Sequence, residues 1–170
     1  RNNHRASHLA NPCIQINVAL YLAESRGEVT LTSTDPSVQP FLDFRLLESS
    51  EDRRRMREAI RIATDLLKHS DFASIVDECV GLTNSDLESD DSLDEWILRE
   101  VTTGQHLTGT CKMGPDSDPS AVVDQFLKVH GIDGLRIADA SIMPNTVRAN
   151  TNATAIMIGE RVADFIKTGR

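Results

Sequence analysis

The residues best suited to chemistry in this chain gather around His106. The segment 105–114 places its imidazole ahead of Thr108, Gly109 and Thr110, so two hydroxyls and a residue that permits close backbone approach follow it. An imidazole titrates near neutral pH and can act as a general base or acid. A lone histidine is more often a structural residue, and it is the neighbours of this one that lead us to predict a catalytic role.

The same segment contains residue types suited to two other kinds of chemistry. Cys111 could act as a nucleophile, but only Lys112 lies beside it in the sequence to stabilise a thiolate. A metal site is not expected, because no second histidine, cysteine or carboxylate falls at ligand spacing around His106. Acid–base chemistry at His106 is therefore favoured over both.

A second polar segment opens the last predicted helix. Asn150, Thr151 and Asn152 all belong to the residue types that cap helices, and one cap needs only one of them. The first turns of this helix are apolar nearly all round, so we expect its N-terminal end to be buried and its positive dipole end to face an anionic group. We predict that this segment and the His106 segment meet at one active site.

The bulk composition excludes several function classes. The chain has 170 residues, the length of one ordinary domain, and its net charge of −8 argues against a nucleic-acid or anionic-membrane partner. No apolar run approaches the ~20 residues of a membrane span, so no integral membrane segment is expected. The three cysteines form no CxxC pair, which suggests reduced thiols and a cytoplasmic protein. Peripheral membrane association of a longer enzyme stays open, and the first residue, which is not methionine, suggests a fragment.

Strand signals occur in two parts of the sequence. Alternating apolar and polar residues predict a strand over 14–22, which a turn at 25–27 joins to a strand over 28–33 as a hairpin. A short strand is predicted over 41–46. Three more short strands are predicted nearer the C-terminus, over 122–124, 126–129 and 135–138.

Helix signals lie between and after these strands. Ser49 is the predicted cap of a helix with apolar residues at helical spacing, and a shorter helix is predicted from Asp71. Ser92 is predicted to cap a third helix that Gly104 ends, and the last helix covers 152–167. We therefore predict an α+β fold, an antiparallel or mixed sheet with flanking helices followed by a C-terminal strand and helix.

Two charged runs are interpreted as solvated surface rather than as binding sites. The first is the group of arginines on the first long helix, Arg53, Arg54, Arg55 and Arg57. The second is the acidic stretch 86–95, read as a loop that leads into a helix start.

The motifs together resemble a known family. The segment 106–114 is similar to the HPxGTxxMG signature of the glucose–methanol–choline (GMC) oxidoreductases, and the segments 122–131, 134–144 and 150–160 are similar to the later motifs of that family. Shorter matches occur upstream, at 25–27, 35–36 and 43. The resemblance covers nearly the whole chain and is choline-dehydrogenase-like.

The resemblance implies an FAD-dependent alcohol oxidase or dehydrogenase. His106 would be the catalytic base that takes the alcohol proton, and Asn150 would hydrogen-bond the substrate oxygen, while hydride passes to flavin N5. Four cofactor-binding residues follow by position: Asp139 and Ala140 along the cofactor, and Asn152 and Thr154 near its ring. Leu107 and Thr151 stand where the family commonly has proline.

The resemblance also predicts what this chain lacks. It contains no GxGxxG, so the N-terminal FAD-binding half of such an enzyme is missing. We expect residues 1–115 to be a portion of the substrate-binding (cap) domain, and residues 116–170 to be a C-terminal return segment that packs on the FAD domain. The expected partners are a small-molecule alcohol and that missing half. By itself, the fragment is expected to be inactive and to bind FAD weakly or not at all.

Two rival functions fit the same residues. One is a cyanohydrin (hydroxynitrile) lyase on the same scaffold, in which FAD has no redox role. The other is a non-catalytic stand-alone interaction domain that kept the fold. The motifs carry no signal for the identity of the alcohol, the electron acceptor or the oligomeric state.

Overall fold

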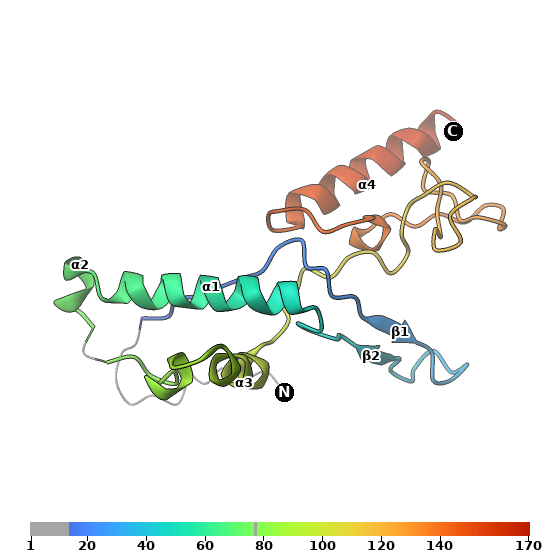
Figure 1. Cartoon of the computed structure of the whole chain (residues 1–170). Coiled ribbons are helices and arrows are strands. Elements are labelled where there is room, and N and C mark those ends of the chain that lie inside the picture. Colours follow the sequence, from blue (N-terminus) through green and yellow to red (C-terminus); the bar gives the residue numbers. More distant parts are fainter. Residues whose placement is uncertain (1–13, 77) are drawn as a thin grey trace. The chain divides into compact units, whose positions relative to one another are not determined.

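The computed structural model describes residues 14–76 and 78–170. Its helices and a small antiparallel sheet lie in separate stretches of the sequence, so the predicted α+β class is confirmed (Figure 1). The described residues cluster into two compact units, 14–19 with 53–100 and 20–52 with 101–170. Within the described ranges, none of the helices has the length and apolar character needed to cross a bilayer.

The first unit is helical. Its elements are α1 (Ser50–Leu67) from Arg53 onward, α2 (Ser70–Ala73), the 3-10 helix η2 (Ser85–Leu87) and α3 (Asp90–Glu100), whereas the first three residues of α1 belong to the second unit. The predicted cap of α1 is confirmed, because the Ser49 hydroxyl accepts a hydrogen bond from the Glu51 N–H at 3.2 Å. Leu93 and Ile97 of α3 are buried, as the apolar spacing of that helix predicted.

The start of α3 differs from the prediction. Ser89, not Ser92, caps the helix: the Ser92 N–H donates to Ser89 Oγ at 3.0 Å, and the Ser89 N–H donates to Ser92 Oγ at 3.1 Å. Ser92 therefore closes this reciprocal capping box instead of opening one. The earlier start places Asp90 and Asp91 in the first turn, where the helix dipole favours negative charge.

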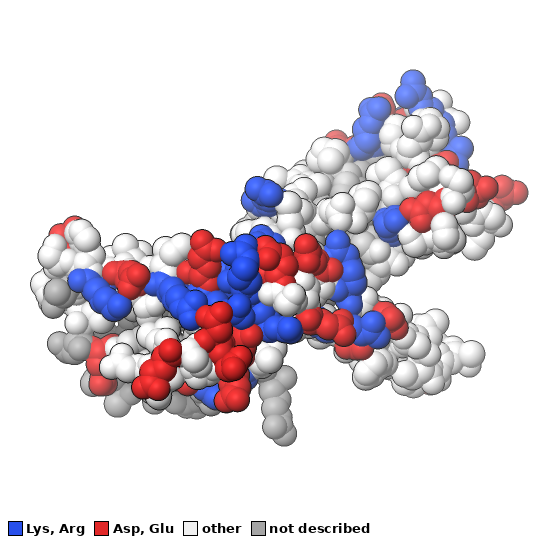
Figure 2. Space-filling model, viewed as in Figure 1, with Lys and Arg blue, Asp and Glu red and all other residues white. Residues whose placement is uncertain are grey.

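The acidic start of α3 is paired with arginines of α1. Arg57 Nη1 donates to both carboxylate oxygens of Asp94 at 2.8 Å, and Arg61 Nη2 lies 2.7 Å from Asp90 Oδ1. Figure 2 shows basic and acidic side chains interleaved over these helices. Only 14% of the Arg57 side chain is exposed, so its assignment to a solvated face is wrong. The reason is that the acidic residues reach it from another helix, which spacing within α1 does not reveal.

The second unit contains the sheet. β1 (Glu28–Thr30) pairs antiparallel with β2 (Phe41–Asp43), with Val29 opposite Leu42. The predicted hairpin between 14–22 and 28–33 is wrong, because residues 14–22 contain no strand in the structure. Alternation predicts a strand with one buried face, but a strand forms only where its backbone groups find a partner.

A buried carboxylate closes the base of the hairpin that β1 and β2 form. Asp52, in the first turn of α1, is fully buried and accepts hydrogen bonds from the N–H groups of Glu24 at 3.0 Å and Ser25 at 2.8 Å. The Ser25 hydroxyl donates to the same carboxylate at 2.6 Å and accepts from the Ser49 N–H at 3.0 Å. The chain entering the hairpin is thus fixed to the start of the helix that follows it.

The C-terminal part of the second unit packs against its last helix, α4 (Asn152–Lys167), which has the predicted bounds. The predicted strands between 122 and 138 occur only as isolated bridges in the described chain, such as Val123 with Val129. Positive φ angles at Leu127, Gly131 and Gly134 turn the chain too often for longer ladders. A cluster of buried side chains holds the region together: Val123, Leu127, Ile142, Met143, Ile158 and Phe165.

Candidate active site

The His106 segment is fixed along the 3-10 helix η3 (Ala140–Ile142). The Cys111 N–H donates to the Ser141 carbonyl at 3.0 Å, and the Met113 N–H donates to the Ile142 carbonyl at 2.8 Å. Ile142 is buried in the core cluster. The segment after His106 is therefore attached to the packed core of the second unit rather than being a free loop.

His106 contacts the start of α4, as predicted. Its Nδ1 lies 2.9 Å from the hydroxyl oxygen of Thr151, although 45 residues separate the two in sequence. A second contact lies close by in the sequence, between the hydroxyls of Thr108 and Thr146 at 2.8 Å, and Thr146 comes four residues before Asn150. The prediction that the two polar segments meet in space is confirmed.

Thr151 uses its hydroxyl for this contact and not for capping. It is the N-cap residue of α4, yet its side chain makes no cap hydrogen bond. It is also nearly buried, with 8% of its surface exposed. The ring of His106 is half-buried, and within the described residues its Nε2 has no hydrogen-bond partner. Nε2 is therefore the ring nitrogen that remains available for a further contact.

Asn150 lies next to Thr151 and is exposed. Its Oδ1 accepts a hydrogen bond from the Tyr21 hydroxyl at 2.8 Å. Sequence reasoning missed Tyr21, because it lies 129 residues away and the alternation around it indicated only a strand. Its position next to Asn150 depends on tertiary structure and has no local signal.

The four predicted cofactor residues lie on two elements. Asp139 caps η3, where its Oδ1 accepts the Ser141 N–H at 2.8 Å, and Ala140 is the first residue of that helix. Asn152 and Thr154 lie in the first turn of α4, the former exposed and the latter half-buried. The structure thus places these residues beside the two segments that carry His106 and Asn150.

The start of α4 is not buried by the described chain. Ile156 and Met157 are 59% and 54% exposed, and Asn152 and Ala153 are exposed as well. The prediction of a buried N-terminal end is therefore wrong for these residues. An apolar surface on all sides indicates burial, but none of the described segments covers this one.

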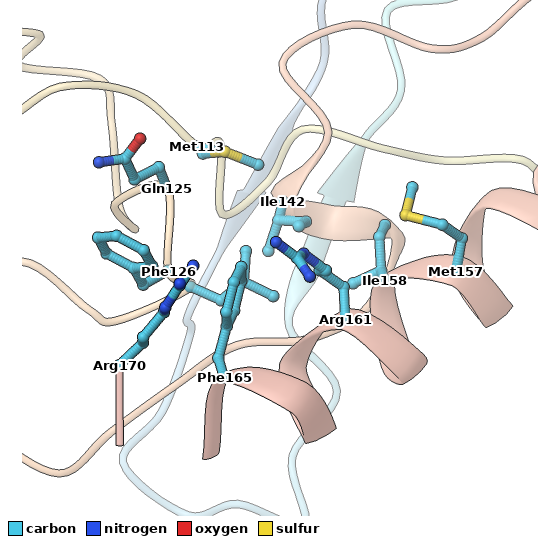
Figure 3. A pocket seen from close by; sticks show the side chains of 10 residues that line it. Met113, Gln125, Phe126, Ile142, Met157, Ile158, Arg161, Phe165 and Arg170 are labelled. Carbon is cyan, nitrogen blue, oxygen red and sulfur yellow. The ribbon is translucent and has the colours of Figure 1, made fainter. Parts of the chain in front are cut away.

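A hollow of about 500 Å³ lies elsewhere on the second unit (Figure 3). Arg161 projects from α4 over the ring of Phe165, 4.6 Å from its centroid, and that ring meets Phe126 edge to face at 5.4 Å. The other lining residues are Met113, Gln125, Leu127, Ile142, Met157, Ile158 and Arg170. Neither His106 nor Asn150 lines this hollow, so the candidate chemistry lies outside it.

Comparisons with known proteins give consistent results. The C-terminal family model described as GMC oxidoreductase matches residues 23–159. The chain is 37% identical over 152 residues to an oxygen-dependent choline dehydrogenase of Rhizobium etli, and 40% identical over 156 residues to one of Cronobacter sakazakii. It covers 28% and 27% of those proteins, which cover 89% and 90% of this chain. A formate oxidase from Aspergillus oryzae, solved in a study of its FAD modification, superposes with a TM-score of 0.81 at 36% identity. That match covers 87% of this chain and 26% of the oxidase.

Proposed function

Because this chain belongs to the GMC oxidoreductase family, as its motifs predicted, we propose that it supplies the substrate side of an FAD-dependent alcohol oxidoreductase. The observation that carries the proposal is the contact of His106 Nδ1 with Thr151 at the start of α4, which leaves Nε2 without a partner among the described residues, while Asn150 is the residue before Thr151. A general base must reach the proton that it removes, and an unengaged imidazole nitrogen can do so.

Each of the two residues has a defined role in this proposal. His106 Nε2 takes the hydroxyl proton of a primary alcohol, and the Asn150 amide donates a hydrogen bond to the oxygen that becomes negative. The carbinol carbon loses a hydride in the same oxidation, which yields an aldehyde. A histidine next to an amide donor suits this task because one group removes the proton and the other stabilises the charge that remains.

The first turn of α4 fits a flavin. The Thr151 side chain makes no cap hydrogen bond, so it leaves the first backbone N–H groups of α4 available. Asn152, the first residue of the helix, is exposed. Backbone N–H groups at a helix start stabilise negative charge. We assign Asn152 and Thr154 to the ring of FAD, and Asp139 and Ala140 to a more distant part of the cofactor. When bound, FAD supplies the acceptor for the hydride.

The rest of the cofactor site comes from a segment outside these 170 residues. The chain spans 26–28% of the relatives compared above, and Asn150 and Asn152 at the start of α4 are exposed. We propose that a flavin-binding half covers the exposed Ile156 and Met157 of α4 and completes the site. In this arrangement residues 1–115 belong to the substrate-binding domain, and residues 116–170 return to the flavin-binding half. Covering the site would also exclude water, which strengthens electrostatic stabilisation of the charged oxygen.

The test measures flavin reduction in the full-length protein that contains this chain, mixed without oxygen with a panel of primary alcohols that begins with choline. We expect bleaching of the oxidised flavin by at least one alcohol. His106→Ala should slow this step by about 10²–10⁴-fold, the contribution of a positioned base. His69→Ala is the matched control, because His69 is exposed on the first unit and should not affect the rate.

Three results would contradict the proposal. Near-normal flavin reduction in the His106→Ala protein would remove His106 from the reaction. Cleavage of a cyanohydrin while the flavin stays yellow would indicate the lyase. A protein that neither binds FAD nor turns over any substrate would indicate the stand-alone interaction domain.

A further inference from the structure

Two hydroxyl groups contact the pair of residues on which the proposed function rests. We propose that Thr151 and Tyr21 are positioning residues: Thr151 holds His106 with Nδ1 protonated and Nε2 free, and Tyr21 holds the Asn150 amide with its NH₂ group toward the substrate. Neither hydroxyl touches the substrate in this proposal. Both act through the residue to which they are hydrogen-bonded.

The contact between Thr151 and His106 determines which ring nitrogen faces outward. Nδ1 lies 2.9 Å from Thr151 Oγ1, so the ring is oriented with Nε2 on the other side. Thr151 is 8% exposed, which limits competition by water for its hydroxyl, and it makes no cap bond that would draw the hydroxyl away. When Nδ1–H donates to Oγ1, Nε2 keeps the lone pair that a base requires.

The contact depends on the residue type at position 151. A side chain without a hydroxyl could neither donate to nor accept from the His106 ring at this place. The threonine therefore adds a group that can select the tautomer of the neighbouring histidine. Its effect should depend on the hydroxyl rather than on side-chain size.

Tyr21 fixes the second residue of the pair. Its hydroxyl donates to Asn150 Oδ1 at 2.8 Å, so the amide oxygen is already engaged. The Nδ2 hydrogens are then the groups left to approach an alcohol oxygen. A flipped amide would present its oxygen instead, which would repel a developing alkoxide. Since Asn150 itself is exposed, a fixed partner is needed to hold one orientation.

The first experiment reads the tautomer directly and needs no flavin. Nitrogen-15 NMR of the histidine-labelled 170-residue chain distinguishes Nδ1–H from Nε2–H imidazole, and His106→Gln identifies the His106 signals. We expect wild-type His106 to be mainly the Nδ1–H form above neutral pH. Thr151→Val, which removes the hydroxyl and keeps the shape, should shift His106 toward the Nε2–H form, whereas Thr151→Ser should retain the wild-type spectrum.

The second experiment uses the full-length enzyme and measures flavin reduction against pH. Thr151→Val should lower the rate severalfold, since part of the histidine is then in the wrong tautomer, and should leave the pH profile in place, because the ratio of the two neutral tautomers does not depend on pH. Thr151→Ser should restore the rate. Tyr21→Phe should lower the rate about fivefold to tenfold, the size expected for one lost hydrogen bond, and leave the pH profile in place.

The outcomes separate this inference from the proposed function. A wild-type His106 that is mainly in the Nε2–H form would overturn the role of Thr151. This result comes from the wild-type protein, so it does not depend on whether a variant folds. Wild-type rates in Tyr21→Phe would overturn the role of Tyr21. If His106→Ala reduces flavin normally while the NMR result is as expected, the proposed function fails and the contact with Thr151 is structural.

Discussion

Lys112, six residues after His106, holds a carboxylate whose ionisation affects stability. Its Nζ lies 2.6 Å from Asp118 Oδ2, and Ser120 donates to Asp118 Oδ1 through its hydroxyl at 2.7 Å and its N–H at 2.9 Å. The hydrogen bond from Lys112, followed by those from Ser120, lowers the pKa of Asp118 from 3.8 to about 2. The folded state therefore favours the ionised carboxylate.

The sign of the resulting pH dependence follows from that lowered pKa. Above the unfolded pKa the ionised Asp118 contributes stability, and this contribution is lost as the pH falls toward the folded pKa of about 2. Asp118→Asn should therefore be less stable than the wild type at about pH 6, with a difference that shrinks toward about pH 3. Urea unfolding at each pH measures it. Asp133→Asn, at an exposed carboxylate, is the control, and an equal difference at both pH values would contradict the prediction.

The residues of the candidate site divide by the kind of signal that they carry. The meeting of the His106 segment with the start of α4 could be predicted, because the residue types in both segments indicate chemistry, whereas the roles of His106 and Asn150 stay predictions. Thr151 was expected to lie at the helix start, but its use of the hydroxyl for His106 instead of a cap depends on how two distant segments pack. Tyr21 could not be predicted, since a tyrosine in an alternating segment gives no information about a partner 129 residues away.

Among the helices, α1 and α3 are joined by an arginine in a largely buried position. Arg57 donates to both oxygens of Asp94, and 14% and 21% of these side chains are exposed. The hydrogen bond to Asp94 raises the pKa of Arg57, so the guanidinium stays charged. Arg57→Met would leave the Asp94 carboxylate without this partner in a poorly hydrated place.

We expect Arg57→Met to lower the free energy of unfolding of the intact chain by about 1.5–3 kcal/mol, the size for hydrogen bonds to a charged group. Arg54→Met is the matched control: Arg54 pairs with Glu58 on an exposed face, with 56% and 63% of the side chains exposed, and should change stability by less than about 1 kcal/mol. Denaturant unfolding of both variants gives the comparison. Equal losses would show that the Arg57 contact adds nothing beyond surface charge.

Helices were predicted better than strands for a physical reason. The bounds of α4 and the cap of α1 follow from local hydrogen bonds and apolar spacing, which a short window of sequence contains. A strand depends on a partner elsewhere in the chain, so the alternation over 14–22 did not reveal that β1 pairs with β2. The start of α3 was misplaced by three residues because two serines at the spacing of a capping box were both suitable caps.

For the whole molecule, the exposed apolar start of α4 and the half-buried His106 belong to the same unit. The chain covers 28% of a choline dehydrogenase to which it is 37% identical, so most of the length of that relative has no counterpart here. The motifs of the sequence predicted correctly that the chain matches the C-terminal model of its family. The burial of α4 was predicted wrongly because apolar composition indicates a covered surface without saying which segment covers it.

The Asp52 carboxylate also has a consequence for chain entropy. By tying Ser25 to the start of α1, it closes the segment 26–49 at its base, so the tip of that segment is a loop whose ends are already joined. Doubling the length of such a loop costs only about 0.6 kcal/mol.

Four Gly/Ser residues inserted between Ser37 and Val38 should therefore lower the free energy of unfolding by less than about 1 kcal/mol. Asp52→Ala should cost more, about 3 kcal/mol, because it leaves buried donors unpaired. Urea unfolding compares the two variants. Equal losses in the free energy of unfolding would show that residues 31–40, and not the Asp52 carboxylate, hold the hairpin closed. The expected difference would make residues 31–40 a place where this fold tolerates inserted sequence.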